Sequence, residues 1–259
     1  MMKQKNEMQV ETQNVNTDEV VVDIHQLKKS FGENHVLKDV CLQLHKGENL
    51  VVLGKSGTGK SVLIKCLVGL IIADEGKLQV LNQDVMDLNA KALNELRTKV
   101  GFLFQSGALY DSMTVRENLE FPLRRQSKSK SQEEMDTLVV EALENVGLAE
   151  AIDKMPSELS GGMRKRISLA RTLILKPEIM LYDEPTTGLD TITSKEISTL
   201  ILNIQKKYQT SSIIITHDME CARIVADRVI VLHEGKIIGE GTYDELKNSS
   251  TKEIKSFFE

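Results

Sequence analysis

Residues Gly54 to Ser61, which read GKSGTGKS, match the phosphate-binding pattern G-x-x-x-x-G-K-[ST]. In this pattern the backbone amides of the loop surround phosphate groups, the lysine reaches the terminal phosphates and the last hydroxyl binds Mg²⁺. The strand-like run Asn49 to Leu53 precedes the loop, and the run VLIKCLVGLII after it favours a mostly buried helix. Strand, glycine loop and helix are the context that the pattern requires, so we predict a nucleotide-phosphate site here.

Polar side chains follow further apolar, strand-like runs. Asp183 and Glu184 come after EIMLY, and His217 comes after SSIIIT. Open α/β sheets bind ligands at the carboxyl ends of their strands, so we expect these groups to gather at one edge. Asp183 would hold Mg²⁺ together with Ser61, and Glu184 would polarise a water for in-line attack on a γ-phosphate. As an alternative, acids at strand ends cap turns without any catalytic role.

Other residues near these runs are weaker candidates. His217 could contact the γ-phosphate or orient the attacking water, and Gln105, after the run FLF, could reach Mg²⁺ or that water. Phe31 could stack on an adenine base, although a lone aromatic residue is more often part of a core. The remaining histidines fall in edge or hairpin segments without carboxylates at ligand spacing, and we treat them as structural: His25, His35, His45 and His233.

A second glycine-rich stretch, Glu158 to Arg166, reads ELSGGMRKR and places a serine and two glycines at an expected helix start. Three cations follow in the first turns, where the positive end of the helix dipole disfavours them. A serine hydroxyl and bare glycine amides suit a phosphate at the helix end, and such an anion would explain the cations. An ordinary N-cap with a solvated basic face explains the residues as well.

Composition limits the class of protein. The 259 residues are 41% hydrophobic and 27% charged, which is ordinary for a globular chain with a real core. A formal net charge of -5 argues against a dedicated nucleic-acid binder. The three cysteines, Cys41, Cys66 and Cys221, are far apart and suggest neither disulfides nor zinc, which fits a reducing compartment. No run reaches the roughly 18 apolar residues of a membrane span, so we expect a soluble chain.

The order of the patterns predicts an α/β fold. We expect residues 1–18, which are rich in Gln and Asn, to form a disordered tail. Strand-like runs from residue 19 predict an antiparallel edge before the buried strand, and residues about 90–175 read as largely helical with a polar break at RQSKSKSQEE. Later apolar runs predict buried strands, with a hairpin at Glu234-Gly235. One domain would span 19–247, followed by a short segment at 248–259.

Six motifs in order resemble the ATP-binding cassette (ABC) ATPase family over roughly residues 20–245. These are GKSGTGKS, Gln105, LSGGM, LYDEP, GLD ending at Asp190, and His217. The resemblance implies a P-loop NTPase core with an antiparallel β subdomain and a helical signature subdomain. In that family the signature helix of one subunit caps the γ-phosphate held by the other. The phosphate expected at ELSGGMRKR would then belong to ATP bound by a second copy of the chain.

The resemblance assigns roles residue by residue. It implies ATP contacts by Phe31, Gly54, Ser56, Gly57, Thr58, Gly59, Lys60, Ser61 and Val62, and by Ser160, Gly161, Gly162 and Asp190 toward the opposite subunit. It implies Mg²⁺ ligation by Ser61, Gln105 and Asp183, and catalysis by Glu184 as base with His217 and Gln105. The sequence departs from the family where Met163 replaces the commoner Gln and where Lys55 replaces a frequent Pro.

The segment Leu103 to Arg124 lies where ABC ATPases receive the coupling helix of their membrane subunit. Thr114 and Glu117 form a T-x-x-E capping box, which predicts a helix from about Val115. With MPSELSGGMRKR, this segment resembles the ATPases of Mla, or MCE-associated, lipid transport systems. That resemblance implies phospholipid transport at the cytoplasmic face of the inner membrane, with permease subunits, an MCE-domain lipid-binding partner and no nucleic acid.

Three alternatives remain beside lipid transport. The same motor could serve an importer of amino acids or another small solute. A soluble nucleotide-gated switch on DNA or ribosomes is disfavoured, since the chain has no second cassette, long coiled coil or basic bias. A simple P-loop kinase would have no use for LSGGM.

Overall fold

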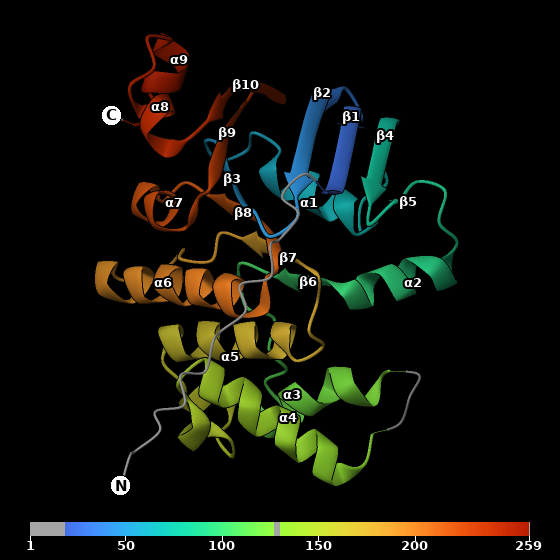
Figure 1. Ribbon diagram of the computed structural model, residues 1–259, viewed down its shortest axis with the longest axis vertical. Helices are drawn as coiled ribbons and strands as arrows, with labels where there is room; N and C mark the ends of the chain where they lie inside the picture. Colours follow the sequence, from blue (N-terminus) through green and yellow to red (C-terminus); the bar gives the residue numbers. More distant parts are fainter. Residues whose placement is uncertain (1–18, 127–129, 259) are drawn as a thin grey trace, which may run out of the picture.

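The computed structural model of the chain describes residues 19–126 and 130–258 (Figure 1). Two β-sheets form its upper part, and a group of helices forms its lower part. The predicted disordered tail, residues 1–18, lies outside the described residues. Among the residues described, none of the helices is long and apolar enough to cross a bilayer.

Two sheets of different type lie in the upper part. Within the described residues, a four-stranded antiparallel sheet has the order β2 (Asn34–His45), β1 (Val20–Phe31), β4 (Glu75–Val80) and β5 (Gln83–Asp84). A six-stranded sheet has the order β10 (Lys236–Gly241), β9 (Arg228–His233), β3 (Asn49–Leu53), β8 (Ser211–Thr216), β7 (Ile179–Asp183) and β6 (Val100–Leu103). Its strands run parallel except β10, which forms the predicted hairpin with β9 through Glu234 and Gly235.

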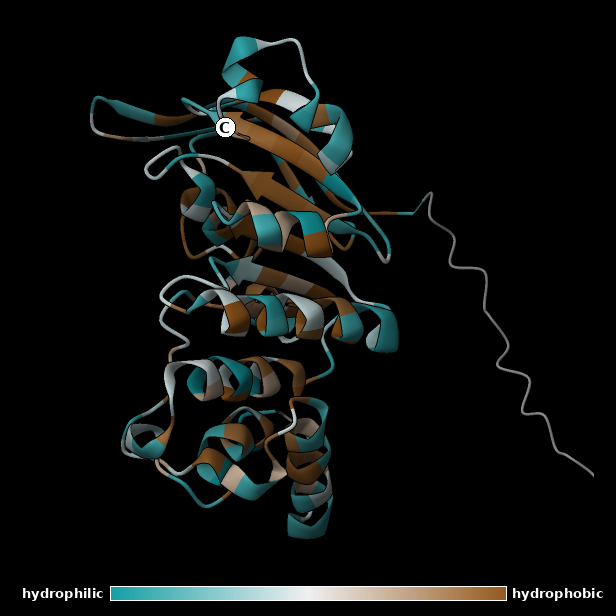
Figure 2. Cartoon of the chain, turned by 90° about the vertical axis from the view of Figure 1, so that its left-hand side faces the viewer, coloured by the Kyte–Doolittle hydropathy of each residue, from teal (hydrophilic) through white to brown (hydrophobic). Residues whose placement is uncertain are grey.

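The central strands are buried on both faces because they read as continuous apolar runs. Every residue of β3, β7 and β8 is buried. Side chains alternate along β3: Leu50 and Val52 pack into one core with α1 (Lys60–Leu67) and the antiparallel sheet. Val51 and Leu53 pack into another with α6 (Thr191–Tyr208) and α7 (Met219–Val225). Figure 2 shows the hydrophobic strands between the more polar helices.

Helix α1 is shorter than the sequence predicts. It ends at Leu67 instead of continuing through VLIKCLVGLII, because Gly69 adopts a left-handed φ of 61°. The amide of Gly69 donates to the Cys66 carbonyl, and the amide of Leu70 donates to the Lys65 carbonyl. This pair of hydrogen bonds is a Schellman motif, which satisfies the carbonyls at a helix end.

The region 90–175 is largely helical, as predicted, but it also supplies β6 to the parallel sheet. Its helices are α2 (Ala90–Lys99), α3 (Val115–Arg124), α4 (Gln132–Asn145), η1 (Ala149–Ala151), η2 (Pro156–Glu158) and α5 (Gly161–Leu173). Helices α3, α4 and α5 enclose an apolar core of their own below the sheets (Figure 1). The polar break falls between Arg124 and Gln132, and its residues 127–129 lie outside the described residues.

The predicted capping box and fold class are confirmed. The Thr114 hydroxyl accepts from the amide of Glu117, whose carboxylate accepts from the Thr114 amide at 2.8 Å, so α3 begins at Val115.

At the carboxyl end of the chain, α8 (Tyr243–Lys247) and α9 (Lys252–Lys255) pack beside β9 and β10.

Candidate nucleotide site

A cavity of about 670 Å³ lies at the carboxyl ends of the parallel strands. It brings together residues that are far apart in the sequence and that the motifs predict as ligands. The lining consists of Phe31, Val36, Lys55, Ser56, Gly57, Gly59, Lys60, Ser61, Val62, Gln105, Glu184 and His217. Val36 and Lys55 were not predicted as ligands, and the predicted Gly54 and Thr58 belong to the loop but do not line the cavity. Nothing in a strand-like run identifies a residue such as Val36, which only forms a wall.

The loop after β3 needs glycine for two physical reasons. Gly59 caps α1 with a left-handed φ of 102°, which side chains rarely adopt. At Gly54 a Cβ atom would lie 2.7 Å from the Leu232 carbonyl oxygen and from Thr58 Oγ1. The hydroxyl of Thr58 donates to the Lys55 carbonyl at 2.9 Å. The loop is therefore closed on itself and on the neighbouring strand β9.

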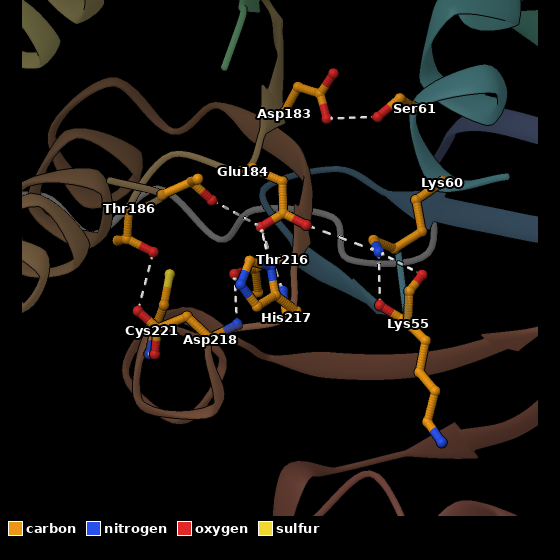
Figure 3. A network of polar contacts seen from close by, with 12 residues as sticks. Lys55, Lys60, Ser61, Asp183, Glu184, Thr186, Thr216, His217, Asp218 and Cys221 are labelled. Carbon is orange, nitrogen blue, oxygen red and sulfur yellow. Dashed lines mark hydrogen bonds and ion pairs between the residues drawn. The ribbon is translucent and has the colours of Figure 1, made fainter. Parts of the chain in front are cut away.

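The ammonium group of Lys60 lies inside this loop and faces the acids of β7. It donates to the Gly54 carbonyl at 2.5 Å and to the Lys55 carbonyl at 3.1 Å. Its distance to Glu184 Oε1 is 3.7 Å (Figure 3). Burial lowers the pKa of Lys60, and the charge of Glu184 opposes that shift. A cation held in this way can exchange its carbonyl partners for phosphate oxygens.

Oxygen atoms suited to Mg²⁺ line the cavity or lie next to it. Ser61 Oγ donates to Asp183 Oδ1 at 2.8 Å, and Gln105 lines the same cavity. Hydroxyl, carboxylate and amide oxygens are ligands that Mg²⁺ accepts, usually completed by water and phosphate. Within residues 19–126 and 130–258 no cluster of three or more His, Cys, Asp or Glu side chains could hold a metal by itself. These donors fit an ion that binds together with the nucleotide.

Glu184 occupies the centre of the site. Its carboxylate lies between Lys60 and His217, with Oε2 2.8 Å from His217 Nδ1 (Figure 3). Thr187 Oγ1 donates to the same carboxylate at 3.3 Å. The backbone of Glu184 adopts a left-handed φ of 51°, a conformation that non-glycine residues adopt mostly where surroundings enforce it. The histidine orients an acid that points into the cavity, as a general base requires.

Phe31 and Asp183 lie where the sequence predicts. The ring of Phe31, at the end of β1, is 50% exposed and lines the cavity, so it is not a core residue. Asp183 is the last residue of β7 and is buried beside Ser61. The histidines predicted as structural lie in β1, β2 and β9, and two of them have local partners: His25 with Asp23 and His35 with Ser30.

The second glycine-rich stretch lies elsewhere on the chain. Ser160 caps α5, and its hydroxyl accepts from the Met163 amide at 3.2 Å. Asp190 caps α6; hydrogen bonds from Thr193 and Ile192 lower the pKa of its carboxyl. Among the described residues that line the cavity, Ser160, Gly161, Gly162 and Asp190 are absent. A Cβ atom on Gly162 would lie 2.6 Å from Thr193 Cγ2, so the two helix starts pack together.

The three cations after the glycines have partners within the chain. Arg164 donates to the Leu159 carbonyl at 2.7 Å, and Arg166 pairs with Glu196 at 2.7 Å. Lys165 is buried and donates to the Gln105 carbonyl at 2.5 Å. The cations therefore hold this chain's own carbonyl and carboxylate oxygens, and the interpretation that they also provide a field for the phosphate of a second copy stays a prediction.

Sequence reasoning did not identify Lys165 as a buried residue that contacts the loop at Gln105. A signal exists, because Lys165 falls four residues before Leu169 and therefore on the buried face of α5. A lysine on the apolar face of a helix needs acceptors inside the protein.

Comparisons with known proteins agree with this geometry. The family model described as "ABC transporter" matches residues 37–187. Over 92% of its length the chain is 41% identical to the probable ribonucleotide transport ATP-binding protein mkl of Mycobacterium leprae, of which it covers 68%. Against other mycobacterial copies it spans 66% of the relative's length. It is 37% identical to Arabidopsis thaliana TRIGALACTOSYLDIACYLGLYCEROL 3, over 93% of this chain and 74% of that protein.

A solute-transport relative and two solved structures are also similar. The glutamine transport ATP-binding protein GlnQ of Geobacillus stearothermophilus is 38% identical, over 90% of this chain and 96% of the relative. The dimeric ATP-binding cassette MJ0796, in a post-hydrolysis state bound to ADP and Pi, superposes with a TM-score of 0.78 at 31% identity, covering 86% of this chain and 98% of that one. For cbiO1 of Clostridium perfringens, part of the complex cbiONQ, the TM-score is 0.81 at 29% identity, with 88% and 90% covered.

Proposed function

Because the chain belongs to the ABC transporter family as an ATP-binding and ATP-hydrolysing subunit, we propose that it powers phospholipid transport through a partner permease. One observation carries the lipid cargo: a relative that is similar along nearly the whole chain is named for trigalactosyldiacylglycerol, a glycerolipid. The resemblance of Leu103 to Arg124 to Mla-type ATPases supports the same cargo.

The residues at the cavity divide the work of hydrolysis. The loop amides and Lys60 would bind the phosphates, and Phe31 would stack on the adenine. Ser61, Gln105 and Asp183 would hold Mg²⁺, whose charge neutralises phosphate oxygens. Glu184 would accept a proton from the attacking water, and its contact with His217 keeps the carboxylate in place.

A second copy of the chain would complete each site. Ser160 and Asp190 are exposed and lie outside the cavity of their own chain, yet their helix starts pack together and form one surface. Helix N-termini with glycine amides bind anions. We therefore propose that this surface meets the γ-phosphate of ATP on the partner copy. Two nucleotides would then hold two chains together, and hydrolysis would release them.

An aromatic and cationic surface next to Gln105 suits a permease. The rings of Tyr110 and Phe121 lie 4.8 Å apart. The guanidinium of Arg171 lies 4.9 Å from the Tyr110 ring, and that of Arg125 lies 4.8 Å from the Phe121 ring. Tyr110 is 40% exposed. Aromatic and arginine side chains are typical of interface centres, and both rings lie in the segment Leu103 to Arg124, which is expected to receive a coupling helix.

In this proposal the chain works at the cytoplasmic face of the inner membrane, with an MCE-domain protein as lipid-binding partner. The second candidate is a small-solute importer, since GlnQ is 38% identical, against 37% for the lipid-named Arabidopsis relative, and matches along 96% of its own length. Both candidates share the same motor and differ in the permease.

Affinity purification from detergent-solubilised native membranes separates the candidates. The tagged chain is recovered, and co-purifying proteins and lipids are identified by mass spectrometry. A permease with an MCE-domain protein and bound phospholipid is the expected result. A permease for amino acids or another solute would overturn the lipid proposal and leave the ATPase intact.

Two variants make the purification more specific. Replacing both Tyr110 and Phe121 by alanine should remove the permease from the purified material, because the docking rings are lost. Val140→Ala removes an exposed apolar side chain, 41% exposed, from α4 in the same helical group and should leave the permease bound. Equal recovery with all three chains would contradict the proposed docking surface.

A further inference from the structure

Lys165 lies on α5, the helix that begins at the signature glycines, and only 7% of its surface is exposed. Its ammonium group points away from solvent and donates to the Gln105 carbonyl at 2.5 Å. A longer contact of 3.4 Å joins it to the Glu184 carbonyl. One side chain from the signature helix therefore touches the backbones of both the Gln105 loop and the proposed base.

Burying a lysine is costly, so its partners should be strong acceptors. The two carbonyls supply hydrogen bonds, and the negative charges of Asp183 and Glu184 also favour the ammonium group. Lys60 reaches these acids from α1 and is itself 6% exposed. The charges of Lys60, from the phosphate loop, and of Lys165, from the signature helix, thus both act on these acids.

Lys165 also supports the strained backbone of Glu184. The Glu184 amide donates to the Ile215 carbonyl at 2.9 Å, and the Glu184 carbonyl accepts from the Thr187 amide at 3.3 Å and from Lys165. These contacts fix both ends of a residue whose φ is 51°. The direction of the Glu184 side chain depends on this conformation, because a backbone rotation would turn the carboxylate away from His217.

The rest of the same face of α5 follows the Gln105 loop. Ser168 lies one turn after Lys165, and a Cβ atom on Gly107 would lie 2.6 Å from its hydroxyl. Arg171, a further turn along, donates to the Ala108 carbonyl. Lys165 and Arg171 therefore donate to carbonyls of the loop 105–108, and Ser168 packs against Gly107 between them. Movement of the signature helix must carry this loop with it.

From these contacts we infer that Lys165 is a positioning residue for ATP hydrolysis. It ties the signature helix to the Gln105 loop and to the backbone of Glu184. When α5 approaches the ATP of the partner copy, Lys165 sets Gln105 and Glu184 of its own chain for hydrolysis. This inference rests on ATP hydrolysis and on the proposed two-copy site, but not on the identity of the transported substrate.

The experiment compares Lys165→Met, which keeps the length and removes the donors, with Lys165→Arg, which keeps a cation. Steady-state ATP hydrolysis and hydrogen–deuterium exchange of residues 104–113 are measured on the full chain. Lys165→Met should lower kcat at least about tenfold and change KM less than about threefold, because positioning and not binding is lost. Exchange of the loop should rise, and Lys165→Arg should recover several-fold of the lost kcat.

Lys176→Met is the matched control. Lys176 follows the same helix, is exposed, and pairs with Glu141 at 3.6 Å. The Lys176→Met chain should hydrolyse ATP at the wild-type rate, and hydrogen–deuterium exchange of residues 104–113 should be unchanged. A wild-type kcat in the Lys165→Met chain would overturn the inference. A fall in kcat without faster exchange of residues 104–113 would overturn it as well, and so would a kcat of Lys165→Arg no higher than that of Lys165→Met. A different cargo in the purification above would leave all these results unchanged.

Discussion

The starts of α1 and α5 are both glycine-rich turns, but their surroundings differ. The turn before α1 faces a cavity with a buried lysine, two acids and a histidine within reach. The turn before α5 is exposed, and its serine hydroxyl is bound to the helix as an N-cap. The first turn can bind and cleave a phosphate anhydride, whereas the second offers anion-binding amides alone. In the proposed dimer, each chain would therefore contribute two different halves to two different sites.

The largest effect should come from Lys60→Ala. Removing the buried ammonium group leaves Glu184 without its cation and the phosphates without theirs. We expect kcat/KM for ATP to fall at least about 100-fold, since one preorganised charged donor is lost. Hydrolysis assays with titrated ATP measure this. A normal kcat/KM in this variant would show that the loop Gly54 to Ser61 does not bind the phosphates of ATP.

Glu184→Gln should separate binding from cleavage. The amide keeps the shape and the hydrogen bond to His217 but cannot accept a proton from water. A fall in kcat of about 100-fold or more is expected, with ATP still bound and a closed dimer trapped. Size-exclusion chromatography with ATP measures the dimer. Wild-type turnover by this variant would remove Glu184 from the role of base.

Ser160→Arg should disable the anion-binding turn before α5 and leave the phosphate loop before α1 intact. The arginine would intrude on the phosphate of the partner copy, so turnover should fall at least about tenfold. Binding of ATP to the isolated chain should remain within about twofold, because Ser160 lies outside its cavity. Ser157→Arg places the same side chain on exposed η2 and serves as the control. Undiminished turnover in Ser160→Arg would refute the trans role.

The smallest effect should come from Thr114→Ala, which opens the capping box of α3. Stability should fall by about 1 kcal/mol, because the Glu117 amide loses its acceptor. Denaturant unfolding measures this loss. ATP affinity should not change, since α3 supports the α5 half and not the phosphate loop. An altered ATP affinity would show that the two halves are less separate than the geometry indicates.

Much of the site could be predicted because its residues follow local patterns. Gly54 to Ser61 form a continuous motif, and the strand ends at Asp183 and His217 must meet at one edge of a parallel sheet. The hairpin at Glu234-Gly235 was predicted for the same kind of reason, since a turn residue between apolar runs specifies it locally.

The rest depends on contacts that sequence spacing does not reveal. The partners of Lys165 lie 60 and 19 residues away, so its spacing on the buried face of α5 does not identify the carbonyls that it contacts. The early end of α1 depends on Gly69 adopting a left-handed φ, although the apolar pattern continues beyond it. In both places tertiary or backbone geometry decides what the periodic pattern does not specify.

The most direct test of the two-half site is a mixture of two inactive chains. Lys60→Ala chains keep an intact signature turn, and Ser160→Arg chains keep an intact phosphate loop. If each site combines the loop of one copy with the turn of the other, mixed dimers contain one intact site. Random mixing should then restore hydrolysis at about a quarter of all sites, because half of the dimers are mixed. If the mixture stays as inactive as its two components, the loop of one copy and the turn of the other do not form a shared site.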